Sequence, residues 1–441
     1  MRINIVIGGK AGQGPNILTH LIAEALVSRG LYIFYSRDYQ SLIRGGHNFN
    51  QLTISNSEVS SNDSKIDLLV ALDENTVKIH SSSLNKKAII MKGEHENMYF
   101  AGRLFKILGL EFEILELELK HLKNFEENLK EASKGWEDEK NKINLEFKNK
   151  SRKLENGSKA VALASIESGL DVYYAYPMTP ATPIMFELAP LQEKNNFLVL
   201  ELESEIAVMN AALGSSITGA KTMIGTSGGG FDLMTEALSM AGQAQIPIVC
   251  YLASRPGPST GVATYTGQGD LNIALYSGHG EFSRTVLAPG DPTEARELTS
   301  QAFYFSQKFG IPSFVLSDKH LAESIYTISQ EAKLTKSQKL TKLKRYNSYE
   351  TNENGEATED AETIRKNVER RLKKAKEIEK EAGKFEQYKV YGNKSSKNII
   401  VSYGSTKGAI LDSLPGDWKF IQILYLEPFP EEIEDELKKA S

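Results

Sequence analysis

Short apolar runs rich in β-branched residues alternate with helically spaced segments along most of the chain, and this alternation constrains the fold most. INIVIG at residues 3–8 is followed by a glycine-rich turn and by apolar residues at helical spacing from Ile17 to Leu26. LYIFYS and the runs at 66–72 and 88–91 continue the pattern. Strands that alternate with helices favour parallel α/β layering. We therefore predict a first α/β domain over residues 1–125.

The same alternation returns over residues 157–328. AVALASIESG has helical spacing, and six short apolar runs follow it, separated by helical segments and glycine turns. The predicted strands are DVYYAYP, FLVLELES, KTMIGTS, IPIVCYLAS, RTVLAPG and PSFVLSD. Such a series predicts a doubly wound α/β domain.

Charged segments separate these regions from one another and from the C-terminal end. In residues 126–150, 13 of 25 residues are charged, so 126–156 is interpreted as a solvated linker or surface helix. The polar stretch 329–397 is interpreted as an insert, with one amphipathic helix within 361–384. Residues 398–441 return to strand, helix, strand and helix, but so few residues cannot bury an adequate core alone. We expect this last unit to be incomplete or docked.

The cysteine count and charge exclude several classes of protein. The chain has 441 residues and one cysteine, Cys250, which can neither close an internal disulfide nor supply the four thiolates of an iron–sulfur cluster. A net charge of -5 argues against general nucleic-acid binding. With no long apolar run and no secretory signal, the chain is predicted to have no membrane span and to be cytoplasmic.

Two glycine-rich loops in the first domain are candidates for anion binding. GGKAGQG at residues 8–14 joins a strand to a helix, where backbone amides suit a phosphate or carboxylate. Its spacing matches neither the dinucleotide motif nor the P-loop, and tight-turn geometry alone explains the glycines equally well. The loop at 41–48 combines a cation, two glycines and an amide, although ordinary turn residues would give the same pattern.

Four polar clusters in the second domain lie at or just after predicted strand ends. They are YPMTPATP at 176–183, the acids of ELESE at 201–205, TSGGG at 226–230 and RPGPSTG at 255–261. The first of these alone would be a rigid turn. Together they lie where open α/β sheets bind ligands.

These motifs, with the block LESEIAVMNAALG, DLMTEALSMAGQAQIPIV, GQGDL, GGKAGQG and SLIRGGHN, resemble the 2-oxoacid:ferredoxin oxidoreductases. The resemblance is to the fused alpha subunit, in which a gamma-type α/β domain precedes a pyrimidine-binding domain and a transketolase C-terminal-like domain. The last is only partial here, at 398–441, so the resemblance implies a shortened C-terminus. That family uses thiamine diphosphate and coenzyme A to convert a 2-oxoacid to its acyl-CoA and carbon dioxide while reducing ferredoxin.

The resemblance implies roles for individual residues. Thiamine catalysis requires a carboxylate facing the aminopyrimidine ring, and Glu205, which enters an apolar helix, is favoured over Glu201 and Glu203. Arg255 and Thr179 are expected to bind the substrate carboxylate and keto group. Thr264 is expected to select the substrate side chain. The remaining candidates are Tyr176 and Pro177 on the pyrimidine side, and Gly12, Gln13, Gly14, Arg44, Gly45, Gly46, His47 and Asn48 as a coenzyme A side.

What the chain lacks predicts a division of labour between subunits. The diphosphate and magnesium site of such enzymes resembles Gly-Asp-Gly, which does not occur here, and Asp270 is not a substitute. No metal ligand is expected in this chain. A beta subunit is expected to bring Mg²⁺ and [4Fe-4S] clusters, in a heterodimer or heterotetramer that reduces ferredoxin. The substrate class stays open among pyruvate, branched-chain oxoacids and 2-oxoglutarate, which is slightly favoured. The alternative function is a non-catalytic coenzyme A- or nucleotide-binding assembly subunit.

Overall fold

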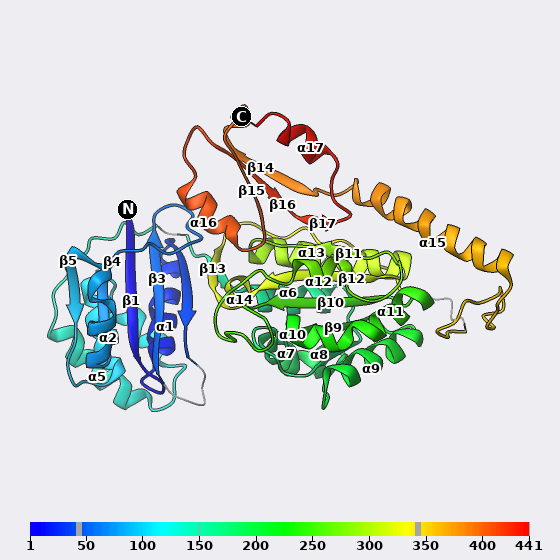
Figure 1. Cartoon of the computed structure of the whole chain (residues 1–441). Helices are drawn as coiled ribbons and strands as arrows, with labels where there is room; N and C mark the ends of the chain where they lie inside the picture. The colour runs from blue at the N-terminus through cyan, green and yellow to red at the C-terminus, as the bar shows by residue number, and fades with distance from the viewer. Residues whose placement is uncertain (41–45, 149, 340–344, 441) are drawn as a thin grey trace. The chain divides into compact units, whose positions relative to one another are not determined.

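The computed structural model describes residues 1–40, 46–148, 150–339 and 345–440, and the chain divides into two compact units (Figure 1). The first comprises residues 1–155 and 324–329, and the second comprises residues 156–323 and 330–441. Both units are layered α/β structures, so the predicted fold class is confirmed.

The first unit is built on a mixed seven-stranded sheet. In spatial order its strands are β5 (Leu84–Met91), β4 (Ile66–Ala71), β1 (Arg2–Lys10), β3 (His47–Ser55), β2 (Tyr32–Asp38), β13 (Ile325–Ile328) and β6 (Lys153–Glu155). The neighbouring pairs β1–β4 and β4–β5 are parallel, and the other neighbouring pairs of this sheet are antiparallel. The antiparallel strand β3 was not predicted, because polar residues interrupt HNFNQLTIS and hide its period.

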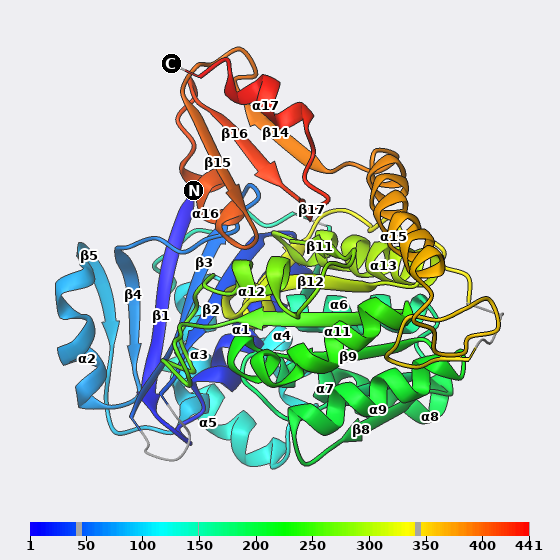
Figure 2. The same ribbon diagram turned by 45° about the vertical axis from the view of Figure 1, so that its right-hand side comes forward.

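Helices cover both faces of this sheet (Figure 2). The main core joins one face to α1 (Pro15–Ser28), α3 (Asn97–Ile107), α4 (Phe112–Leu119) and α5 (Phe125–Glu137), and α2 (Glu74–His80) packs on the other face. A Cβ at Gly102 or Gly135 would overlap backbone atoms of the facing helix, so these two glycines let α3 and α5 touch. The expected linker at 126–156 therefore begins with a helix that belongs to this core.

The strand β13 belongs to the first unit, although it follows residues 156–323 of the second unit in the sequence. Ile325 and Tyr326 pair with β2, and Tyr326 to Ile328 pair with β6. The sequence prediction assigned these residues to the domain at 157–328. A short strand that pairs with residues about 290 positions earlier carries no local signal of its partner. Thr327 Oγ1, for example, is hydrogen-bonded to the backbone of Ile33, 294 positions earlier in the chain.

The second unit contains the predicted doubly wound sheet. In spatial order its strands are β17 (Tyr425–Glu427), β11 (Thr285–Leu287), β12 (Pro312–Asp318), β10 (Ile248–Ser254), β9 (Thr222–Thr226), β7 (Val172–Ala175) and β8 (Leu198–Glu201). All pairs are parallel except the pair of β17 with β11. The chain leaves β7 toward β8 and leaves β9 toward β10, so the topological switch point lies between β7 and β9.

Two hydrophobic clusters fill the two faces of this sheet. One contains residues of α6 (Gly157–Glu167), α7 (Thr182–Leu188) and α13 (Pro292–Phe309). The other contains residues of α9 (Glu205–Ile217) and α11 (Thr235–Ala244). Cys250 is buried in the second cluster, where burial raises the pKa of its thiol.

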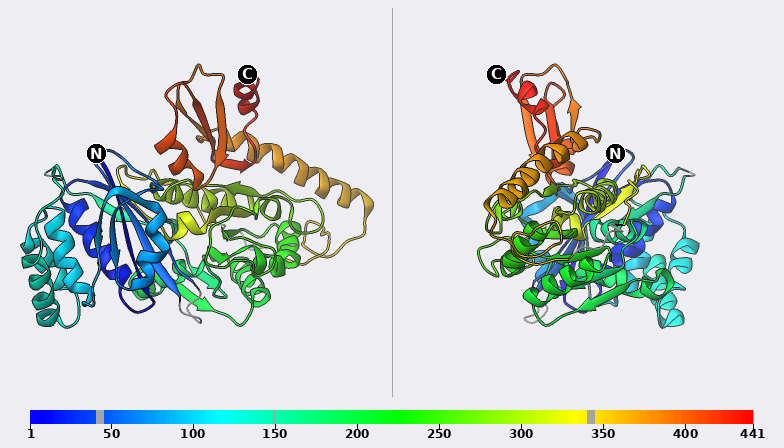
Figure 3. Two further views of the ribbon diagram at one scale, coloured as in Figure 1. Left: turned by 60° about the vertical axis from the view of Figure 1, so that its left-hand side comes forward. Right: turned by 90° about the vertical axis from the view of Figure 1, so that its right-hand side faces the viewer.

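The C-terminal residues form a three-stranded sheet that docks on the main one. Its strands are β14 (Tyr388–Gly392), β16 (Lys419–Ile423) and β15 (Ile399–Tyr403), with the helices α15 (Ala361–Ala382), α16 (Thr406–Ser413) and α17 (Glu432–Leu437). Figure 3 shows α15, the predicted amphipathic helix, as one long helix. The second of the two strands predicted within residues 398–441 was expected to be continuous, and that was wrong: β16 stays in the small sheet, whereas β17 joins the main sheet beside β11.

Candidate functional site

The candidate site gathers at the carboxyl ends of β7, β9 and β10, beside the switch point. Loops that follow β7 and β9 diverge there, because their helices pack on opposite faces of the sheet. The predicted clusters at 176–183, 226–230 and 255–261 are the loops that follow these three strands. The β8 strand contributes the acidic segment that leads into α9.

Glu205 is the first residue of α9 and its side chain is buried, with 5% of the residue exposed. Ser204 caps the helix by accepting a 3.3 Å hydrogen bond from the amide of Ala207. Within the described part of the chain, the Glu205 carboxylate has no hydrogen-bond or ion-pair partner. Glu201 and Glu203 are exposed, as expected for solvated acids.

The Glu205 carboxylate packs against the TSGGG turn. A Cβ built on Gly230 would lie 2.8 Å from Glu205 Oε1, in contact with Thr226 Oγ1 and 3.0 Å from Met178 Cε. Position 230 must therefore be glycine for the carboxylate to lie where it does. A buried carboxylate needs a hydrogen-bonding partner, so this one is available to a ligand nitrogen. That chemistry fits the aminopyrimidine end of thiamine diphosphate.

Arg255 and Thr179 are brought together from two different loops. Arg255 Nη1 donates a 2.8 Å hydrogen bond to the backbone carbonyl of Thr179. This is one of five N–H groups, so the guanidinium keeps donors for a carboxylate. Burial lowers the pKa of Arg255, and the charge of Asp270 opposes that effect.

The other predicted residues of this region lie nearby in the chain. Tyr176 is 39% exposed directly after β7, and Pro177 is half-buried beside it. Thr264 is half-buried in the loop that carries Arg255. That loop folds back on itself, because the amide of Val262 donates to the carbonyl of Pro256 at 3.1 Å. No hydrogen bond of Thr264 to Arg255 or Thr179 occurs among the described residues.

Asp270 is a further residue of the site, which sequence reasoning considered only as a magnesium ligand and rejected. Its carboxylate touches the position where Gly228 would carry a Cβ, and its Oδ2 is buried without a described hydrogen-bond partner. Burial raises the pKa of Asp270, while Ser254, the Gly228 amide and Arg255 oppose the rise. The motif GQGDL was the signal that marked this position.

In the first unit Lys10 pairs with His47 and Gly9 with Asn48 across β1 and β3, so the first glycine-rich loop lies beside residues 47–48 of the second. The Gln13 side chain is used internally, accepting from the Lys10 amide at 2.7 Å and donating to the Leu72 carbonyl at 3.0 Å. Gly14 caps α1 in a left-handed conformation. Gly12 has φ of 93° and no atom within 4 Å of a built Cβ.

The second of these loops is only partly described. Gly46 is exposed, and the side chain of Asn48 accepts a 3.3 Å bond from the amide of Gln40. Arg44 and Gly45 lie outside the described residues.

The His47 ring packs on Gly8, where a Cβ would lie 2.8 Å from its Cε1, and against His80 at the end of α2. Its Nε2 lies 2.8 Å from His80 Nε2, and Phe49 packs against both rings. Burial lowers the pKa of His47, and burial together with His47 lowers the pKa of His80 to about 4. One imidazole must donate and the other accept, so the pair is neutral near pH 7.

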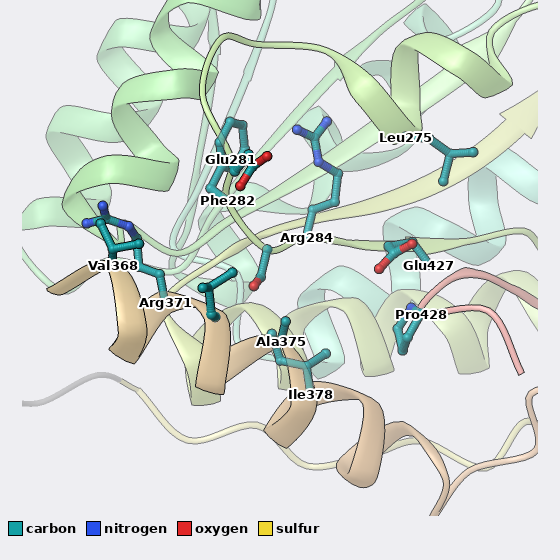
Figure 4. A pocket seen from close by; sticks show the side chains of 12 residues that line it. Leu275, Glu281, Phe282, Arg284, Val368, Arg371, Ala375, Ile378, Glu427 and Pro428 are labelled. Carbon is teal, nitrogen blue, oxygen red and sulfur yellow. The ribbon is translucent and has the colours of Figure 1, made fainter. Parts of the chain in front are cut away.

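A cavity of about 510 Å³ lies elsewhere in the second unit, between α15 and the loop that precedes β11 (Figure 4). Apolar side chains of α15, among them Leu372 and Ile378, form one wall, and Phe282 and Arg284 form another. Arg284 donates to the carbonyls of Ala274 and Ser277, at 3.1 and 2.6 Å, and so holds the end of α12 (Leu271–Tyr276). None of the predicted site residues lines this cavity.

No helix within the described ranges combines the length and hydrophobicity needed to cross a bilayer. Across the same ranges, no cluster of three or more histidine, cysteine, aspartate or glutamate side chains is arranged to hold a metal ion.

Comparison with protein families gives two matches. Residues 163–390, more than half of the chain, match the family described as pyruvate flavodoxin/ferredoxin oxidoreductase, thiamine diphosphate-binding. Residues 4–121 match the family described as pyruvate ferredoxin/flavodoxin oxidoreductase.

Individual relatives agree with these matches. The alpha subunit of a 2-oxoacid:ferredoxin oxidoreductase from a Sulfolobus species is 28% identical over all of this chain and 89% of its own length. The KorA subunit of 2-oxoglutarate synthase from Archaeoglobus fulgidus is 37% identical over 39% of this chain and 51% of its own length.

A solved structure shares the fold of the whole chain. The 2-oxoglutarate:ferredoxin oxidoreductase from Magnetococcus marinus, with 2-oxoglutarate, coenzyme A and succinyl-CoA bound, superposes with a TM-score of 0.85. The alignment covers 100% of this chain and 90% of that one, at 21% identity.

Proposed function

The chain belongs to the pyruvate ferredoxin/flavodoxin oxidoreductase family, and on that premise we propose that it is the alpha subunit of a 2-oxoacid:ferredoxin oxidoreductase. The reaction is the oxidative decarboxylation of a 2-oxoacid to an acyl-CoA and carbon dioxide, with two electrons passing to ferredoxin. The observation that carries the proposal is the buried, unpartnered carboxylate of Glu205 at the switch point.

Glu205 is proposed to hold the pyrimidine ring of thiamine diphosphate. Its carboxyl group would hydrogen-bond a ring nitrogen and keep a proton there, which favours the tautomer of the ring that can remove a proton. When bound, the cofactor supplies the nucleophilic carbon that adds to the keto group and retains the electrons when carbon dioxide leaves. Tyr176 and Pro177 are proposed to line the same ring.

Arg255 and Thr179 are proposed to bind the substrate. The planar guanidinium, fixed at one end by the Thr179 carbonyl, presents its remaining donors to the carboxylate of the oxoacid. The Thr179 hydroxyl is proposed to contact the keto oxygen, and Thr264 to face the substrate side chain. Burial strengthens such a charged contact, because fewer water molecules compete for it.

Coenzyme A is proposed to bind along the loops of the first unit that contain Gly12, Gly14, Gly46 and Asn48. The space beside Gly12 and the N-terminal end of α1 support an anionic group there. Gln13 and His47 are proposed to shape these loops and not to touch the ligand, because their side chains are engaged within the unit. Arg44 and Gly45 are proposed as cationic and permissive neighbours.

The remaining parts of the reaction are proposed to reside on a beta subunit. One buried cysteine cannot ligate a cluster, so [4Fe-4S] groups, Mg²⁺ and the diphosphate end of the cofactor belong to that partner. A heterodimer or heterotetramer in the cytoplasm, with ferredoxin as acceptor, is the proposed working form.

The test is a turnover assay on the complex of the full chain with its beta subunit. A low-potential acceptor and coenzyme A are supplied, and pyruvate, 2-oxoglutarate and branched-chain oxoacids are compared by acceptor reduction. We expect turnover that depends on thiamine diphosphate, with 2-oxoglutarate preferred. Coenzyme A binding without turnover on any oxoacid would instead identify a non-catalytic binding subunit.

A further inference from the structure

A turn of the C-terminal unit is bonded to the loop that carries Asp270. The turn lies between β15 and α16, at residues 403–405. Asp318, at the end of β12 and 1% exposed, accepts a 2.7 Å hydrogen bond from Ser405 Oγ and a 3.0 Å bond from Gln268 Nε2 at the same Oδ2 atom. The two donors come from segments more than a hundred residues apart.

Both the side chain and the backbone of Gln268 are hydrogen-bonded. Its amide group also approaches the carbonyl of Tyr403 at 3.4 Å, and the Tyr403 hydroxyl donates to the carbonyl of Gln268 at 3.3 Å. Between them, Gly404 has φ of 67°, and a Cβ there would lie 2.7 Å from Gln268 Nε2. The turn therefore packs so closely on the Gln268 side chain that a side chain at position 404 would not fit.

Asp270 lies two residues after Gln268 in the same loop. Burial, with the charges of Asp318 and Asp270, raises the pKa of Tyr403. Asp270 in turn packs on Gly228 and lies within electrostatic reach of Arg255. The same loop also packs directly behind Arg255, because a Cβ built on Gly267 would lie 3.0 Å from the backbone nitrogen of Pro256, the next residue.

We propose that Gln268 is a positioning residue: clamped by Asp318 and the turn at 403–405, it fixes the loop that packs on Gly228 and Pro256, and this loop holds Arg255 in the orientation that receives a substrate carboxylate. The inference rests on the proposed function, since it assigns the substrate contact to Arg255. It also gives the short C-terminal unit a role in catalysis, because that unit supplies the second half of the clamp.

The physical reason lies in what Arg255 lacks. Its one described hydrogen bond within the chain fixes a single nitrogen, so the plane of the guanidinium can still rotate. A carboxylate nearby favours one orientation over the others. Asp270 can supply that preference while its loop is held between Gly228 and the turn at 403–405.

The test compares Gln268→Ala, Ser405→Ala and the control Ser413→Ala in the complex of the full chain with its beta subunit. Ser413 lies in α16 of the same C-terminal unit, and its hydroxyl bonds only the backbone of its own helix at Ala409. We expect KM for the 2-oxoacid to rise about tenfold in Gln268→Ala and about threefold in Ser405→Ala, as loss of one or two hydrogen bonds to a buried carboxylate would give. KM for coenzyme A and the melting temperature should change little, and Ser413→Ala should match the parent.

Two outcomes would overturn the proposed positioning role of Gln268. One is an unchanged KM for the 2-oxoacid in both Gln268→Ala and Ser405→Ala, while Arg255→Lys raises it. The other is a parallel change of both KM values together with a lower melting temperature, which would indicate a general loss of folding. If Arg255→Lys itself leaves KM for the oxoacid unchanged, the proposed function of Arg255 fails instead, so the two failures are distinguishable.

Discussion

Arg255 Nη1 donates a 2.8 Å hydrogen bond to the backbone carbonyl of Thr179, and this bond fastens the loop after β10 to the loop after β7. The two loops are adjacent because β9, which separates their strands, ends in the glycine turn at 226–230. The three glycines of this turn have no side chains and leave room above the strand. The proposed substrate-binding pair therefore depends on the glycines between them.

Replacing Arg255 by lysine tests the guanidinium directly. Lysine keeps the charge but loses the planar fork, so the bond to Thr179 and a two-pronged grip on a carboxylate cannot both form. We expect KM for the 2-oxoacid to rise at least about tenfold, with KM for coenzyme A unchanged. Steady-state kinetics of the complex measure both.

The matched control is Arg296→Lys. Arg296 binds both oxygens of Glu167 at 2.7 and 2.8 Å in the same unit, on α13 and away from the strand ends. The variant Arg296→Lys should leave both KM values unchanged. Equal effects of the two variants would argue that Arg255 has only a structural role.

Much of this site could be predicted from the sequence, because its residues belong to short motifs at strand ends. Strand β7 and the first turn of α9 are local features, and Glu205 was placed at a helix start by the apolar spacing after it. The contact of Asp270 with Gly228 could not be predicted, since it joins loops that only the sheet order brings together.

The same reason explains the other differences. β13 pairs with a strand of the other half of the chain, and the apolar run that holds β16 and β17 divides between two sheets, neither of which has a local signal. His47 was grouped with its loop, but its ring packs against His80 and Phe49. Long-range packing decided each case.

Gly230→Ala tests whether the glycine turn positions Glu205. The new Cβ would lie 2.8 Å from Glu205 Oε1 and in contact with Thr226, so the carboxylate must move. We expect kcat/KM to fall at least about a hundredfold, as a displacement near 1 Å typically gives. Gly229→Ala is the control, because its Cβ meets nothing closer than Ser259 O at 3.5 Å. Similar activity of the two variants would refute the packing argument.

Glu294→Gln tests the buried ionic cluster that docks the C-terminal unit. Glu294 Oε1 lies 2.6 Å from Lys407 Nζ and 3.0 Å from Lys389 Nζ. Losing this charge should cost about 3 kcal/mol of unfolding free energy at pH 7, since both ammonium groups lose a buried partner. Glu167→Gln, whose carboxylate is half-exposed, should cost under about 1 kcal/mol. Equal losses would contradict the argument.

The pH dependence of this effect has a definite sign. Despite its burial, the lysine charges and hydrogen bonds lower the pKa of Glu294 from 4.5 to about 2. Its contribution to stability is therefore complete above about 4.5 and is lost as pH falls toward 2. The difference in unfolding free energy between the parent and Glu294→Gln should narrow over that range, and urea unfolding at several pH values would measure it.

The histidine pair predicts an acid sensitivity of the first unit. The folded pKa of His80 is lowered from 6.5 to about 4, so the unfolded chain binds its proton first. Stability should decline as pH falls from about 6.5 toward 4, and His80→Gln should make that decline shallower. His20→Gln, on the exposed side of α1, should leave the slope unchanged. Identical slopes for all three proteins would contradict the pairing.

The central claim is that Glu205 is the acid of a thiamine-dependent active site, and Glu205→Gln tests it most directly. Glutamine keeps the size of the side chain but cannot hold the proton, whereas Glu201→Gln and Glu203→Gln change exposed acids of the same segment. Acceptor reduction by the complex, with saturating 2-oxoacid, coenzyme A and thiamine diphosphate, should fall at least about a thousandfold in Glu205→Gln and stay within about twofold in the two controls. Full turnover by Glu205→Gln would contradict the account.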